Sequence, residues 1–86
     1  MRPRRRDHFS PAQVRAARGL LGWTQERLAA VSDVDPLAIA RFEGVRGELS
    51  EYQAERVGAA LNEAGIIAIQ AAHAGAGVRF KKPQTR

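Results

Sequence analysis

Apolar residues recur at helical spacing through most of the chain and alternate with polar residues only near its end. A helix over residues 11–21 would place Val14, Ala17 and Leu21 on one face, because they are spaced three and four residues apart. Arg18 falls on that same face. The pattern therefore predicts an amphipathic helix whose buried side carries a cation, and a buried cation needs a partner.

Capping signals mark the boundaries of this first helix and of a later one. Ser10 followed by Pro11 is typical of a helix start, and Gly22 is typical of a helix end. A later helix is predicted to start at Ser50, which forms a capping box with Gln53. This later helix repeats the apolar spacing and is expected to stop at Gly65; its core positions are Val57, Ala60, Leu61 and Ala64.

Between these helices, Thr24 to Gly44 predicts two short helices joined by a tight turn. Thr24 is a suitable N-cap, and Trp23 before it can pack on Leu28 as a hydrophobic staple. Asp33 is expected in the left-handed conformation, which Asp tolerates better than most residues other than glycine.

The second short helix is predicted to open at Asp35 as N-cap with Pro36 at its first position. Ile39 and Phe42, with Val34 in the turn, form a narrow stripe that should be buried. The remaining surface of this helix is expected to face outward; it comprises Pro36, Leu37, Ala40 and Arg41.

Residues 65–83 differ in character from the helical part of the chain. Ile66 to Ile69 is short and rich in β-branched residues, Val78 to Lys81 alternates apolar and basic residues, and Ala and Gly dominate between them. This pattern predicts a β-hairpin. Because an isolated two-stranded hairpin is marginal in water, it should either lie on the helices of its own chain or pair with a second copy.

The central stretch resembles the helix-turn-helix of the lambda-repressor-like family, of the Xre/Cro type. The matching residues are Gln25, Leu28-Ala29, Asp33-Val34 and the run Ile39-Ala40-Arg41-Phe42-Glu43-Gly44. The resemblance covers roughly residues 12–64. It implies a mainly α fold, with a four-helix helix-turn-helix domain over residues 10–64 and a short C-terminal β-hairpin. It also implies an ion pair between Arg18 and Glu43.

The resemblance further implies a transcriptional regulator that binds double-stranded DNA in a sequence-specific manner, as a homodimer on an inverted repeat. A repressor that occupies a promoter is expected, and activation through contact of Glu48 and Glu51 with polymerase is the alternative. Gln25 would hold a phosphate at a helix N-terminus, and Arg41 would read guanine or hold a phosphate. Apolar contacts with thymine methyl groups would come from Pro36, Leu37 and Ala40. The hairpin would be the dimerisation element, through Ile66, Ile67, Ile69, Val78 and Phe80.

The net charge of +5 is concentrated at the two ends of the chain, which hold 8 of the 14 cations. Residues 1–9 form a basic arm that is expected to be flexible and to reach DNA through Arg4, Arg5 and Arg6. The alternative for this arm is a solvated tail that only aids solubility. Residues 84–86 are a short tail. Residues 7–78, between the two clusters of cations, carry all 9 acids and are slightly acidic.

Two of the acids, Asp33 and Asp35, lie where the family pattern has a glycine and a serine or threonine. Both would bring negative charge close to DNA phosphates, which Arg27 and Arg46 can offset. The same charges would suit a second class of function, a helix-turn-helix that binds another protein, such as an antitoxin or an antagonist of another regulator.

Composition argues against several other classes. There is no cysteine, so the chain cannot form disulfides. The longest apolar run, Gly65 to Ile69, is far too short to cross a bilayer. We therefore expect a cytoplasmic, nucleoid-associated protein without a membrane partner. The histidines, His8 and His73, have no carboxylates at ligand spacing in the sequence, and no glycine-rich phosphate loop is present. We therefore expect no enzyme activity, metal or cofactor.

Overall fold

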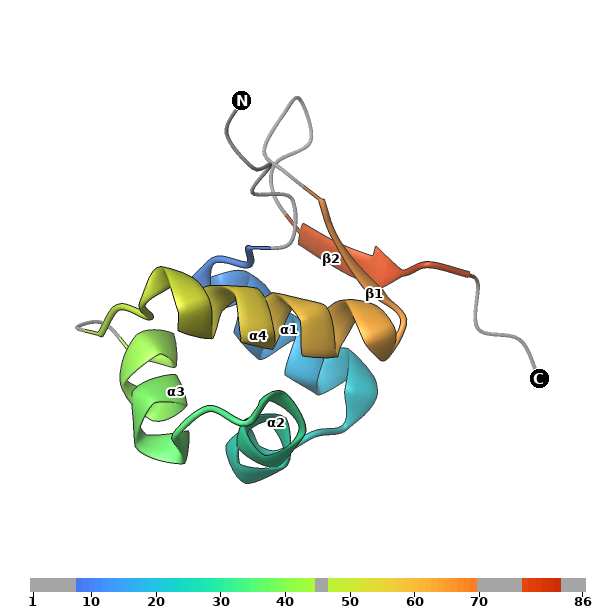
Figure 1. Cartoon of the computed structure of the whole chain (residues 1–86). Coiled ribbons are helices and arrows are strands. Elements are labelled where there is room, and N and C mark those ends of the chain that lie inside the picture. The colour runs from blue at the N-terminus through green and yellow to red at the C-terminus, as the bar shows by residue number, and fades with distance from the viewer. Residues whose placement is uncertain (1–7, 45–46, 70–76, 83–86) are drawn as a thin grey trace.

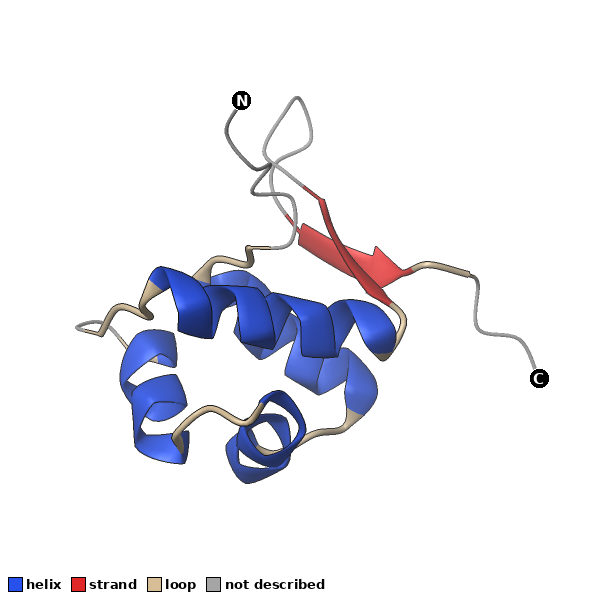
Figure 2. Ribbon diagram, in the orientation of Figure 1, coloured by secondary structure: helices blue, strands red, loops and turns tan. Residues whose placement is uncertain are grey.

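The computed structural model describes residues 8–44, 47–69 and 77–82. Within these ranges the chain forms four helices and a two-stranded hairpin (Figures 1 and 2). The elements in order are α1 (Pro11–Leu21), α2 (Gln25–Ser32), α3 (Pro36–Glu43), α4 (Glu51–Glu63), β1 (Ile66–Ile69) and β2 (Gly77–Phe80). The prediction of a mainly helical chain that ends in a short hairpin is therefore confirmed.

The helix ends follow the local signals in the sequence. Ser10, Thr24, Asp35 and Ser50 each accept a hydrogen bond from a backbone N–H of the first helical turn. Gly22 and Asp33 end α1 and α2 in the left-handed conformation, with φ angles of 70° and 60°. One boundary differs slightly from the prediction, because α4 is capped at Ala64 and the left-handed Gly65 follows one residue later.

The hydrophobic core lies where the four helices and the hairpin meet. α2 packs against α3 and α4, α1 packs against α3 and β2, and α4 packs against β1. Phe9 is buried in this core although the sequence assigned it to the basic arm, so the packed domain begins at least one residue earlier than predicted. The largest fully buried side chains are Val14, Leu28, Ile39, Val57, Leu61 and Ile66.

The hairpin lies on the helices of its own chain, on the side of α1 and α4 that faces away from α2 and α3 (Figure 1). Its strands are antiparallel, with Ile66 opposite Phe80 and Ile69 opposite Gly77. The buried Gln13 of α1 donates from Nε2 to the carbonyl oxygens of Ile69 and Gly77, at 3.0 and 2.9 Å. One side-chain amide thus ties α1 to both strands where the hairpin opens toward its loop.

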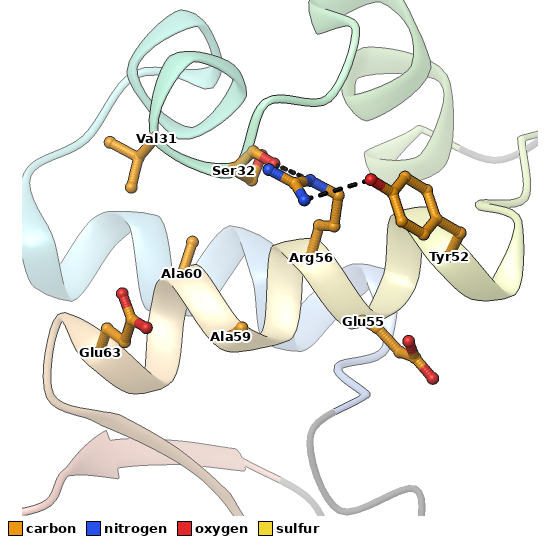
Figure 3. Close-up of a pocket in the computed structure, with 8 residues that line it drawn as sticks. All are labelled: Val31, Ser32, Tyr52, Glu55, Arg56, Ala59, Ala60 and Glu63. Atoms are coloured by element: carbon orange, nitrogen blue, oxygen red, sulfur yellow. Dashed lines mark hydrogen bonds between the residues drawn. The ribbon is translucent and has the colours of Figure 1, made fainter.

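Arg56 of α4 closes the C-terminal end of α2. Its Nε donates to the carbonyl oxygen of Ser32 at 2.7 Å, and its terminal nitrogen Nη1 donates to the Tyr52 hydroxyl at 3.2 Å (Figure 3). A guanidinium at this end also opposes the negative end of the helix dipole. Beside it lies a groove of about 380 Å³ between α2 and α4, with Val31 and Tyr52 on its wall.

Gly47 lies directly over the last turn of α3. The Gly47 N–H donates to the carbonyl oxygen of Arg41 at 3.0 Å. A Cβ atom at Gly47 would lie only 2.6 Å from the Arg41 carbonyl carbon and 2.8 Å from its oxygen. Gly47 is therefore required by close backbone approach, which the sequence pattern did not indicate.

We predict that Gly47→Ala destabilises the fold by about 1 to 3 kcal/mol, the usual cost of forcing extra atoms into a packed site. The matched control is Gly19→Ala, because a Cβ there meets nothing within 4 Å and Gly19 lies inside α1. That control should stabilise the protein by roughly 0.5 to 1 kcal/mol, since alanine favours a helix more than glycine does. Urea unfolding of both variants measures the difference, and equal stabilities would contradict the contact.

Candidate nucleic-acid-binding surface

The carboxylate of Glu43, the last residue of α3, is the centre of a polar network among the first three helices. Arg18 of α1 donates to both of its oxygens, from Nε at 2.7 Å and from a terminal nitrogen at 2.6 Å. The Glu43 side chain is 3% exposed and the Arg18 side chain 20%. The ion pair that the family resemblance implied is therefore present, in the bidentate geometry that gives strong charge-assisted hydrogen bonds.

The environment of Arg18 keeps its charge. The hydrogen bond to Glu43 raises the pKa of the Arg18 guanidinium above its ordinary value, while burial acts in the opposite direction and is outweighed. Its remaining terminal nitrogen donates to the carbonyl oxygen of Trp23 at 2.9 Å, in the turn between α1 and α2. Arg18 thus holds that turn as well as the end of α3.

Gln25, the first residue of α2, also belongs to this network. Its Nε2 donates to a carboxylate oxygen of Glu43 at 3.1 Å, so the amide points toward α3 and not away from the protein. The guanidinium of Arg15 adds a hydrogen bond to the backbone oxygen of Glu43. The start of α2 and the end of α3 are therefore neighbours, and one of the two amide hydrogens of Gln25 is already in use.

The outward face of α3 is as the sequence predicted. Pro36, Leu37 and Arg41 are exposed, Leu37 to 55%, and Ala40 is half-buried. On the opposite face Ile39 is fully buried and Phe42 packs against the core. This helix therefore presents one long cation and an apolar strip on its exposed side.

Arg27 is exposed in the first turn of α2. Its guanidinium carbon lies 5.8 Å from the centre of the Trp23 ring, which is within the range of a cation–π contact. Trp23 itself packs against the core, so it provides a fixed platform for this cation. The sequence indicated Arg27 only as a charge that offsets nearby acids and did not reveal the role of Trp23 as its platform.

Three carboxylates lie beside this surface. Glu26, Asp33 and Asp35 line a groove of about 350 Å³ between α2 and the start of α3. Asp35 accepts a hydrogen bond from the Leu37 N–H at 3.0 Å, and Asp33 lies 3.6 Å from a nitrogen of Arg56. The charges of Asp33 and Asp35 are therefore partly compensated within the protein.

The described residues bring Gln25, Arg27 and the outward face of α3 into one region. The other predicted DNA contacts, Arg4, Arg5, Arg6 and Arg46, lie outside the described residues. Among the predicted dimer contacts, Ile66 is fully buried against its own helices, which leaves its side chain no surface for a second copy. Ile67, Val78 and Phe80 are half-buried, and Ile69 is exposed.

Comparison of the sequence with protein-family models and with curated proteins gave no match. Among the described residues, no helix has the length and apolar character needed to span a membrane. Functional assignment therefore depends on the residues and the geometry given above.

We predict that Glu43→Gln destabilises the protein by about 3 kcal/mol, because it removes the buried charged partner of the partly buried Arg18 guanidinium. The matched control is Asp33→Asn, which neutralises an acid of an exposed pair whose side chains are 36% and 86% exposed. This control should cost at most about 1 kcal/mol. Thermal and denaturant unfolding of both variants measures the contrast, and similar losses would mean that the Glu43 network does not anchor α3.

Proposed function

We propose that this protein is a double-stranded DNA-binding transcriptional regulator, a repressor, with a lambda-repressor-like helix-turn-helix formed by α2 and α3. The observation that carries the proposal is the division of α3 into an anchored face and an exposed face. Ile39 and Glu43 hold the helix to the domain, whereas Leu37 and Arg41 project from it. In this motif the second helix enters the major groove while the first crosses the phosphate backbone.

The start of α2 is suited to a phosphate. Its first backbone N–H groups and the helix dipole favour an anion there. Gln25 can donate its second amide hydrogen to a phosphate oxygen while it keeps its hydrogen bond to Glu43. Arg27 in the same turn adds a positive charge. The contact of Gln25 with Glu43 also supports a fixed spacing between the backbone contact and the recognition helix.

Base readout would depend mainly on Arg41. A guanidinium can donate to O6 and N7 of guanine at once, while Leu37 and Ala40 can contact thymine methyl groups. One long donor per half-site gives a weak direct code, so DNA shape would contribute strongly to the choice of operator. Repression would follow from occupation of a promoter, in the cytoplasm at the nucleoid.

A homodimer would place two α3 helices in successive major grooves of an inverted repeat, about 34 Å apart. We assign the dimer contact to the outer side of the hairpin, chiefly to Ile69 and Ile67. Ile69 is 39% exposed and lies at the end of β1, whereas Ile66 is committed to its own core.

A second candidate function is binding to another protein, as an antitoxin or as an antagonist of another regulator. The observation that favours it is the groove lined by Glu26, Asp33 and Asp35 beside the apolar Leu37. Carboxylates there would repel phosphates, but they would suit a partner with a basic and apolar surface.

We predict that the protein binds a short random duplex with an affinity that falls steeply with salt. The logarithm of the binding constant should fall by about 0.9 per phosphate neutralised for each unit of log salt concentration. Arg41→Ala should weaken binding and lower the preference among sequences. Fluorescence anisotropy titrations at several salt concentrations measure these quantities.

The matched control for Arg41 is Arg79→Ala, which removes the same charge from the exposed surface of β2, on the opposite side of the molecule (Figure 1). It should leave sequence preference unchanged. Equal effects of the two variants would contradict the docking through α3. A parent protein that binds no duplex at low salt would contradict DNA binding itself and favour the protein-binding alternative.

We predict that Ile69→Asp yields a folded monomer, because a charge at the exposed end of β1 opposes the proposed dimer contact. Leu20→Asp is the control, since Leu20 is an apolar residue of similar exposure, 45%, on α1. Leu20→Asp should remain dimeric in sedimentation velocity runs. Circular dichroism shows whether each variant is folded. A folded Ile69→Asp variant that stays dimeric would mean that the dimer interface is not on the hairpin.

A further inference from the structure

Three side chains that often bind metals converge between the start of the described chain and the first turns of α4. They are His8, Glu51 and Glu55, and their potential ligand atoms all lie within 4.8 Å of one another. No carboxylates stand at ligand spacing from His8 in the sequence, yet the fold brings two beside it. Spacing along the sequence could not show this proximity, because His8 and the two glutamates come from distant parts of the chain.

The backbone holds both sides of this cluster in place. His8 is directly followed by Phe9, which is buried in the core, and by Ser10, which caps α1 through two reciprocal hydrogen bonds with Gln13. Glu51 and Glu55 are four residues apart on α4, so their side chains share one helical face. The cluster is thus built from two segments whose positions are set by core packing and helix capping.

The neighbouring cation does not compete for Glu55. Arg56 directs its guanidinium to the Ser32 carbonyl oxygen and the Tyr52 hydroxyl. The Glu55 side chain points away from Arg56, on another side of α4 (Figure 3). Its carboxylate is therefore directed away from that guanidinium, and it can turn toward the imidazole and the second carboxylate.

We propose that His8, Glu51 and Glu55 form a binding site for a divalent first-row transition metal, with Zn²⁺ as the representative ion. Zinc accepts imidazole nitrogen and carboxylate oxygen at about 2.0 to 2.2 Å, so side-chain rotations would bring the three donors to one ion. The two carboxylates match the charge of the ion. An imidazole ligand disfavours Mg²⁺ and Ca²⁺, which prefer oxygen donors throughout.

Such a site would act as a clamp between the chain preceding α1 and the N-terminal part of α4. With three protein ligands, water would complete the coordination of the ion. Because the ion would bind the folded chain and not the unfolded one, it would raise the melting temperature. The site shares no residue with the proposed DNA contacts, so its presence does not depend on the proposed function.

The test is an isothermal titration of ZnCl₂ into the full chain after treatment with a chelator. We expect one equivalent of Zn²⁺ to bind and to raise the melting temperature. His8→Ala and Glu55→Gln should each weaken binding by about tenfold or more, since even the loss of an outer-shell partner has this effect. All three ligand side chains are at least partly exposed, so these variants should fold normally.

Two matched controls separate this site from adventitious binding. Glu63→Gln neutralises another exposed glutamate of α4, and His73→Ala removes the only other histidine of the chain. Both should bind Zn²⁺ with the affinity of the parent. The proposal is overturned if the parent protein binds no Zn²⁺, or if all variants lose Zn²⁺ affinity equally. It is also overturned if a control variant loses affinity while His8→Ala retains it.

Discussion

The buried carboxylate of Glu43 is the interaction on which the arrangement of the first three helices depends. It accepts hydrogen bonds from Arg18 of α1 and Gln25 of α2 while its own backbone ends α3. A charge that is 3% exposed is tolerated only when its oxygens are fully paired, so these helices can move relative to one another only by breaking the network. The polar network thus restricts α3 to one orientation.

That restriction has a direct consequence for the surface of the protein. Because Ile39 and Glu43 are held inside, Leu37 and Arg41 must project outward from the same short helix. Gly47 then passes directly over the Arg41 backbone, which confines the end of α3 from a second side. A helix of only eight residues would be marginal alone, and here α3 is positioned by contacts at its C-terminal end.

The hairpin compensates for the small size of the domain. A chain of 86 residues buries a limited core, and Ile66 is among its largest fully buried side chains. Gln13 joins the hairpin to α1 by two hydrogen bonds to strand carbonyls, so the strands are part of the folded unit and not an appendage. One face of the hairpin therefore contributes to the core through Ile66, and Ile69 is exposed on the other face.

Local chemistry in the sequence determined where the elements begin and end. Each helix is capped by a residue next to it in the sequence: the N-caps are Ser10, Thr24, Asp35 and Ser50. Two helices end at the left-handed residues Gly22 and Asp33. Short-range patterns were therefore sufficient to predict the helix boundaries. The periodicity likewise identified the outward face of α3. The partner of Arg18 came from the family resemblance, since periodicity showed only that a partner was needed.

Contacts between residues distant in sequence were decided by the tertiary structure alone. The hydrogen bond from Gln25 to Glu43, the burial of Ile66 by its own helices and the approach of Gly47 to Arg41 each depend on how the elements pack. The convergence of His8 with Glu51 and Glu55 is of the same kind. Sequence patterns report the environment within a few residues, whereas these contacts join segments that only the folded core brings together.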